Sequence, residues 1–197
     1  MTKRIVPDTC AGAIIDVQDF FLAQLDGPEA RARMETNLVN FARLLDYFRI
    51  PIVATVERPV EAKGGLPGPL KGQLANAKLF EKDFFDLTKE ETIRDHLARL
   101  NRKQIAVAGC ETDVCVLQSC LGLLDLGYEV FVVEDLVFSS TFDVAAALAR
   151  LEAEGAVLLS YKTLYYELIQ AVGGGSHAEA MEAAFGRFPD DLPDQMG

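Results

Sequence analysis

Residues 105–140, IAVAGCETDVCVLQSCLGLLDLGYEVFVVEDLVFSS, decide the fold. The runs QIAVAG (104–109) and EVFVVE (129–134) are short and almost continuously apolar, which is typical of strands buried on both faces of a sheet. Between them the sequence predicts a helix over 113–126, with Gly127 at its C-terminal cap. A strand, a helix and a second strand joined by short connections predict a parallel sheet covered by helices.

The same alternation continues in both directions along the chain. We predict further strands at 11–16, 51–56, 77–80 and 156–160, and helices at 29–48, 88–100, 142–153 and from Lys162 to the glycines at 173–175. The helix at 88–100 opens with Thr88-Lys89-Glu90-Glu91, a capping-box pattern. The sequence therefore predicts a doubly wound α/β domain, and the length of 197 residues suits a single domain over 1–197.

One connection is longer than the rest. Residues 57–76 hold four of the fifteen glycines and three of the eight prolines. A loop of this length in a compact domain is usually functional or mobile.

Composition excludes several classes of protein. The net charge is −11 and no basic run exceeds a dipeptide, which argues against nucleic acid as a partner. The apolar runs are far shorter than the roughly 20 residues that span a bilayer. The first ten residues lack the apolar core of a signal peptide, so we expect a cytoplasmic protein that binds no membrane. The four cysteines form no CxxC pair and are expected to be free thiols.

Two chemically active groups are predicted to meet at one edge of the sheet. Ligands of open parallel sheets bind at the carboxyl ends of strands where the winding direction reverses. Asp16 ends the first strand, and the fourth strand leads through CETDVC (110–115) into the next helix. With Thr112 as N-cap, Cys115 would be the third helical position, where the positive end of the helix macrodipole favours a thiolate.

Each of these residues also has a plainer interpretation. Cys115 could be a small buried residue that begins a helix, and Asp16 a turn former, with Asp19 as the competing carboxylate. Lys82 could be a solvated surface lysine, although the aromatic residues beside it could remove it from water.

These residues also carry a resemblance to a known family. The chain is similar to the isochorismatase-like cysteine hydrolases over roughly 11–170. The resemblance rests on AIIDVQ (13–18), on FEKDFF (80–85), and on the signature residues Gly109, Thr112, Cys115, Val116, Gly127, Tyr128 and Asp135.

The resemblance implies a three-layer sandwich around a six-stranded, mostly parallel sheet of order 3-2-1-4-5-6. It implies Cys115 as nucleophile, Asp16 as general base and acid, and Lys82 as the cation that keeps Asp16 ionised. It also implies a cis peptide at Cys110–Glu111 and an oxyanion hole formed by the backbone amides of Glu111 and Cys115. The resemblance implies no cofactor. It implies a homo-oligomer.

The chain departs from the nicotinamidase relatives of this family. Residues 55–59 are Thr-Val-Glu-Arg-Pro where those relatives carry an Asp-x-His metal cluster, and the histidines, His96 and His177, fall on predicted helices. We therefore expect no metal and do not expect nicotinamidase activity. A cysteine nucleophile favours hydrolysis of a small amide or related C–N bond over vinyl ether hydrolysis.

The substrate would be a small molecule. Phe20, Phe21, Glu57, Arg58 and Phe84 are the candidate pocket residues, together with Phe85 and Phe138. The aromatic residues could equally belong to the core, and Glu57 and Arg58 could pair at a subunit interface. A catalytically quiet binding or scaffold protein of the same fold is the alternative function. A flavin- or phosphate-binding domain is disfavoured because DVQDFF (16–21) has no glycine-rich phosphate cradle.

Overall fold

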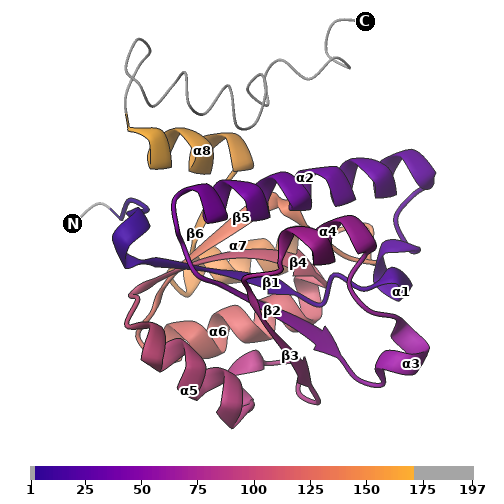
Figure 1. Cartoon of the computed structure of the whole chain (residues 1–197), viewed down its shortest axis with the longest axis horizontal. Helices are drawn as coiled ribbons and strands as arrows, with labels where there is room; N and C mark the ends of the chain where they lie inside the picture. Colours follow the sequence, from indigo (N-terminus) through magenta and orange to yellow (C-terminus); the bar gives the residue numbers. More distant parts are fainter. Residues whose placement is uncertain (1–2, 171–197) are drawn as a thin grey trace, which may run out of the picture.

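Six parallel strands form the centre of the computed structural model, which describes residues 3–170 (Figure 1). They run in the order β3-β2-β1-β4-β5-β6, the predicted order, and every neighbouring pair is parallel. The strands are β1 (Cys10–Ile15), β2 (Ile52–Glu57), β3 (Lys78–Lys82), β4 (Gln104–Cys110), β5 (Glu129–Phe138) and β6 (Val157–Leu159).

Helices cover both faces of the sheet. The longer ones are α2 (Pro28–Tyr47), α5 (Glu91–Leu100), α6 (Leu117–Asp125), α7 (Ala145–Ala153) and α8 (Tyr161–Ile169); short helices are α1 (Asp19–Leu22), α3 (Val60–Lys63) and α4 (Gly68–Gln73), with the turns η1 (Pro7–Thr9), η2 (Leu87–Lys89) and η3 (Thr112–Val116). Helices α2, α4 and α8 lie above the sheet in Figure 1, and α5 and α6 lie below it. The predicted three-layer sandwich is confirmed.

Two separate cores explain the layers. Successive side chains of a strand point to opposite faces, so Ile14 joins one core and Ile15 joins the other. The first core takes Phe41 from α2 and Leu164 from α8, and the second takes Leu97 from α5 together with residues of α6 and α7. The strands β1, β2 and β4 are almost entirely apolar because both of their faces are covered, whereas the edge strand β3 is largely exposed.

Two element boundaries differ from the sequence prediction. Strand β3 continues beyond residue 80, so Lys82 is its last residue rather than part of the following loop. The capping box at Thr88 was wrong, because α5 begins only at Glu91. The Asp86 carboxylate instead accepts hydrogen bonds from both the backbone N and the hydroxyl of Thr88, at 2.8 and 2.7 Å, and caps the turn η2.

The long connection at 57–76 is a packed part of the fold. It contains α3 and α4, and Leu66, Leu70 and Leu74 are buried in the first core. The connection begins with a cis peptide at Arg58–Pro59.

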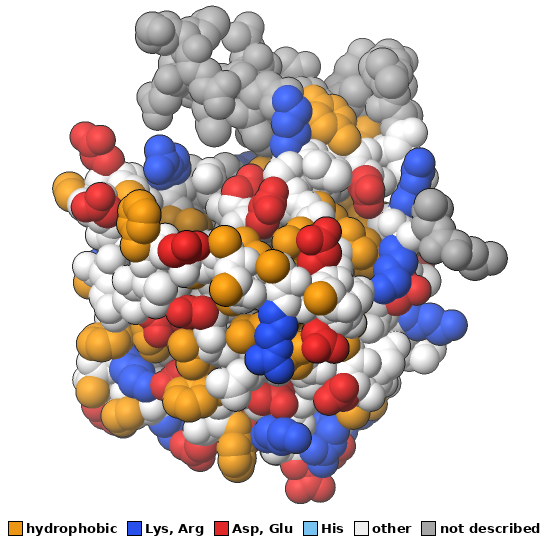
Figure 2. Space-filling view, turned by 180° about the vertical axis from the view of Figure 1, so that it is seen from behind, with side chains coloured by type: hydrophobic (Ala, Val, Ile, Leu, Met, Phe, Trp, Pro, Cys, Tyr) orange, Lys and Arg blue, Asp and Glu red, His pale blue; other side chains and the backbone are white. Residues whose placement is uncertain are grey.

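The surface mixes charges of both signs. Figure 2 shows acidic and basic side chains interspersed with apolar ones over one face of the molecule. None of the helices in residues 3–170 is long and apolar enough to cross a membrane. His177 and the glycines at 173–175 lie outside the described residues.

Replacing Gly109 tests how closely β1 and β4 approach each other. Its φ is +123°, and a Cβ there would lie 2.1 Å from the carbonyl oxygen of Ile15 on β1. We expect Gly109→Ala to lower the free energy of unfolding by at least about 2 kcal/mol, through backbone strain and a clash that no side chain can relieve. The measurement is urea denaturation followed by circular dichroism.

Gly72→Ala is the matched control, because a Cβ on Gly72 of α4 would meet no atom within 4 Å. It should leave stability unchanged or raise it by about 0.5–1 kcal/mol. Equal stability of the two variants would contradict the tight approach of β1 and β4.

Candidate active site

Polar side chains from neighbouring strands meet at the carboxyl edge of the sheet. The register of β2 and β3 places Glu57 opposite Lys82. The register of β1 and β4 places Ile15 opposite Gly109, so Asp16 follows next to Cys110. This is the edge predicted from the switch in winding direction, because β1 to β3 extend the sheet one way and β4 to β6 the other.

Asp16 and Lys82 form an ion pair sealed from solvent. The Lys82 Nζ lies 2.7 Å from Asp16 Oδ2, and both side chains are 0% exposed. The hydroxyl of Thr55 donates to Asp16 Oδ1 at 2.8 Å. Asp16 has a φ of 51°, in the left-handed region that few non-glycine residues adopt. Lys82 also donates to the Phe84 carbonyl at 3.0 Å, and its Nζ lies 3.5 Å from Cys115 Sγ.

Cys115 comes from the turn that follows β4. Residues 112–116 form a π-helical turn, η3, which continues into α6. Its N-cap is Glu111, so the prediction of Thr112 as N-cap was wrong and Cys115 is the fourth helical position. The Thr112 hydroxyl is buried and makes no hydrogen bond to the described residues. The peptide between Cys110 and Glu111 is cis, at the predicted position.

Glu57 completes this group of side chains. The Cys115 thiol donates to Glu57 Oε2 at 3.1 Å, and Lys63 of α3 forms a close ion pair with Glu57 Oε1. Gln18 holds the Glu57 backbone from both sides: its Oε1 accepts from the Glu57 N at 2.7 Å and its Nε2 donates to the Glu57 carbonyl at 3.1 Å. The sequence predicts Glu57 as a pocket residue but does not predict its hydrogen bond with the thiol.

The charges at this edge set the protonation of the four groups. Burial raises the pKa of Asp16, although Lys82 and Thr55 oppose the shift. Burial acts to lower the pKa of Lys82, but the negative charges around it outweigh burial and the pKa is raised. Burial acts to raise the pKa of Glu57, but hydrogen bonds from Lys63 and Cys115 outweigh it and the pKa is lowered.

The thiol of Cys115 is neutral in this arrangement. Burial raises its pKa well above the ordinary value, the Asp16 charge and the bond to Glu57 raise it further, and Lys82 opposes them. The sequence had predicted a thiolate from the helix macrodipole. The raised pKa of Cys115 runs against that expectation, because burial and the nearby Asp16 and Glu57 carboxyl groups outweigh a macrodipole that contributes only about half a charge.

The other candidate pocket residues lie in different surroundings. Arg58 extends outward to Glu81 and Asp83, at 3.1 and 2.6 Å. Phe20 and Phe84 are about half exposed, at 50% and 53%. Phe21 is buried and lies against the Lys63 ammonium, 5.9 Å from the ring centroid. Phe85 is half exposed and Phe138 is buried in the first core.

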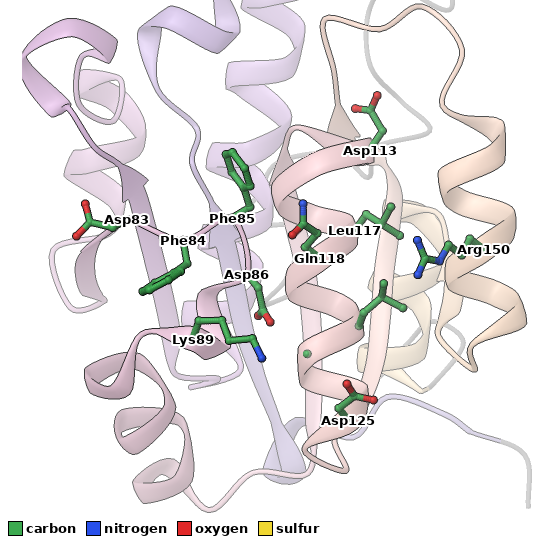
Figure 3. A pocket seen from close by; sticks show the side chains of 12 residues that line it. Asp83, Phe84, Phe85, Asp86, Lys89, Asp113, Leu117, Gln118, Asp125 and Arg150 are labelled. Atoms are coloured by element: carbon green, nitrogen blue, oxygen red, sulfur yellow. The ribbon is translucent and has the colours of Figure 1, made fainter.

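A large cavity lies on the outer side of α6 (Figure 3). It has a volume of about 810 Å³ and includes Phe84, Phe85 and Lys89 on one wall. The opposite wall carries Asp113, Leu117, Leu121 and Asp125, at four-residue spacing along one helix face. Cys115 is only 2% exposed and does not line this cavity.

The same edge could in principle hold a cation. The ligand atoms of Asp16, Glu57 and Cys115 all lie within 4.8 Å of one another. The Lys82 ammonium already lies among them, 2.7 Å from Asp16 and 3.8 Å from Glu57. This lysine supplies the positive charge that a metal ion would bring, so the residues present do not fit a metal site well.

Comparison with known proteins identifies the family. A model of the isochorismatase domain matches residues 10–163. The chain belongs to the isochorismatase family. The secreted isochorismatase effector Isc1 of Phytophthora sojae is 31% identical over 175 residues, which cover 86% of this chain and 81% of that protein.

Solved structures share the isochorismatase-family fold. YcaC from Pseudomonas aeruginosa, described with hexane-2,5-diol and covalent acrylamide, superposes with a TM-score of 0.86 at 23% identity over 100% of this chain and 96% of its own. The Escherichia coli YcaC product, described as an octameric hydrolase of unknown specificity, gives 0.85 at 22% identity with the same coverage.

Replacing Lys82 by Met tests the buried ion pair. Asp16 would then be a buried charge without a compensating cation, and we expect a loss of about 3–5 kcal/mol in the free energy of unfolding at neutral pH. The raised pKa of Lys82 means that its contribution is present below the pKa of an unfolded lysine, about 10.4, and is lost as pH rises through the folded value.

Lys89→Met is the control, because Lys89 is exposed at the rim of the outer cavity. It should change stability by less than about 0.5 kcal/mol. Equal denaturation midpoints for Lys82→Met and wild type at neutral pH would contradict the ion pair.

Proposed function

We propose that this isochorismatase-family protein is a cysteine hydrolase that cleaves a small amide or related C–N bond through a covalent intermediate on Cys115. The observation that carries the proposal is the position of the thiol, whose sulfur lies 3.5 Å from the Nζ of a lysine that is ion-paired with Asp16. A nucleophile, a carboxylate with a raised pKa and a fixed cation at one sheet edge are the parts that nucleophilic catalysis requires.

In the first half of the reaction, Cys115 Sγ attacks the carbonyl carbon and its proton passes to Asp16. The carbonyl electron pair moves onto oxygen, where the backbone amides of Glu111 and Cys115 would donate to it. The Glu111 carboxylate accepts a hydrogen bond from Ser140 N at 3.0 Å, so the proposed role of Glu111 at the oxyanion belongs to its backbone amide. Collapse breaks the C–N bond, and Asp16 returns the proton to the leaving nitrogen.

In the second half, water attacks the thioester carbonyl while Asp16 accepts its proton. The C–S bond breaks, and the proton on Asp16 restores the thiol. Because the resting thiol is neutral, attack and proton transfer must be coupled, and this makes Asp16 the central acid–base group. Lys82 keeps Asp16 ionised between steps.

A structural relative supports a reactive nucleophile on this fold. The Pseudomonas aeruginosa YcaC structure contains covalent acrylamide. Acrylamide adds nucleophiles at its C=C bond and keeps its amide group, so this capture supports a nucleophile that small molecules can reach.

We also propose a homo-oligomer in the cytoplasm. The Escherichia coli relative is octameric, and the fully exposed Phe142 together with half-exposed Phe84 and Phe85 offers apolar surface for a subunit contact. All four cysteines are free and buried, as expected in a reducing compartment.

One observation favours the alternative of a catalytically quiet binding protein. Cys115 is 2% exposed and the large cavity lies on the other side of α6. Such a protein would bind ligands in the outer cavity and release no product from any amide.

Kinetics of variants test the proposal. Ammonia release from a panel of small primary amides should be abolished in Cys115→Ala and reduced about 10²–10⁴-fold in Asp16→Asn, which loses general acid–base catalysis. Cys120→Ala is the control, because that thiol is buried in the second core, and it should keep near-wild-type turnover. Full activity of folded Cys115→Ala would contradict the mechanism.

A further inference from the structure

Two carboxylate–lysine pairs flank the sulfur of Cys115. Asp16 with Lys82 is fully buried, and Glu57 with Lys63 lies toward the surface, since the Lys63 side chain is 20% exposed. The proposed mechanism uses only the first pair. Gln18 fixes the second pair in place. It forms hydrogen bonds with the backbone N and carbonyl of Glu57, and its Nε2 also donates to the carbonyl of Gly64, at the end of α3, at 2.7 Å.

The two carboxylates differ in what they can accept. Asp16 Oδ1 accepts the hydrogen bond of the Thr55 hydroxyl, whereas Oδ2 lies 2.7 Å from the Lys82 Nζ and accepts no hydrogen bond from the described residues. The thiol proton is donated to Glu57 Oε2, at 3.1 Å. Glu57 is a poor final base, because Lys63 and Lys82 stabilise its charge and its pKa is lowered. It accepts the hydrogen bond of the thiol without taking the proton.

We propose that Glu57 is a positioning residue that holds Cys115 as an oriented, neutral thiol until a substrate N–H group takes over its hydrogen bond. This inference rests on the cysteine-hydrolase function proposed above and narrows the substrate to compounds with an N–H donor beside the reacting carbonyl, such as primary amides. Once Glu57 is occupied, the S–H group turns to Asp16, whose carboxylate lies within 4.8 Å of the sulfur.

Every element around the sulfur contributes to its titration. Asp16, directly after β1, acts on the thiol together with Lys82 on β3 and Glu57 on β2. Lys63 on α3 acts through its ion pair with Glu57. On β4 the remaining titratable neighbour is the thiol of Cys110, which donates to the Asp16 carbonyl at 2.9 Å. Among the charged groups that act on the thiol directly, Glu57 can therefore lose its charge without breaking the Asp16–Lys82 ion pair.

Alkylation by iodoacetamide, followed at Cys115 by mass spectrometry across pH, tests this role without any turnover. In Glu57→Gln, loss of the negative charge should move the alkylation half-point at least about one pH unit lower than in wild type, a tenfold faster reaction at pH about 8. Lys63→Met should shift it in the opposite direction, because the Glu57 charge loses its compensating cation.

Glu61→Gln is the matched control, since Glu61 is an exposed carboxylate on α3, the short helix that also carries Lys63. It should leave the profile unchanged. A wild-type profile in folded Glu57→Gln would overturn the proposal. If Glu57→Gln fails to fold, an alkylation half-point in Lys63→Met that is unchanged or lower than in wild type would overturn it.

Substrate selectivity tests the second part. The ratio of kcat/KM for a primary amide to that for its methyl ester, which has no N–H group, should fall at least tenfold in Glu57→Gln. An unchanged ratio would overturn the role of the substrate N–H. If wild type hydrolyses neither compound, the proposed function and this selectivity both fail, whereas the alkylation profiles still decide whether Glu57 controls the thiol.

Discussion

The rest of the structure depends on one buried interaction, the ion pair between Asp16 and Lys82. It joins the ends of β1 and β3 across β2, and the same ammonium reaches the Phe84 carbonyl and the sulfur of Cys115. Taking two charges out of water costs several kcal/mol for each ion, so such a pair stabilises a fold little compared with apolar side chains of the same volume. We interpret its presence here as a requirement of chemistry.

The sheet makes that arrangement possible. The two halves of the chain extend it in opposite directions from β1 and β4, so these neighbouring strands end side by side at the point where the winding direction reverses. Gly109 lets β4 approach Ile15 closely, and Thr55 and Gln18 fix Asp16 and Glu57 from the sides. Each reactive group is therefore held by backbone geometry and by a polar neighbour. A functional site needs this support to keep its geometry.

Most of the architecture could be predicted from the sequence, because buried parallel strands leave apolar runs and the helices leave periodic patterns. The meeting of Asp16 and the 110–115 segment at one edge was also predictable from the topology, whereas Lys82 was expected there only through the family resemblance. The local protonation was not. A thiol near a helix start suggests a thiolate, but Glu57, 58 residues away in the chain, accepts its hydrogen bond. At Thr88 the error was local, because the carboxylate of Asp86, two residues earlier, caps the turn and takes the hydrogen bonds of Thr88.

The central claim is that Cys115 carries a covalent intermediate, and trapping that intermediate tests the claim most directly. The protein would be mixed with a hydrolysed amide, quenched in acid within the turnover time, digested and mapped by tandem mass spectrometry. The account predicts the mass of the acyl group on the peptide that contains Cys115, disappearing when substrate is exhausted. Steady turnover with an acyl group on another residue, or with none on Cys115 even when deacylation is slowed, would contradict it.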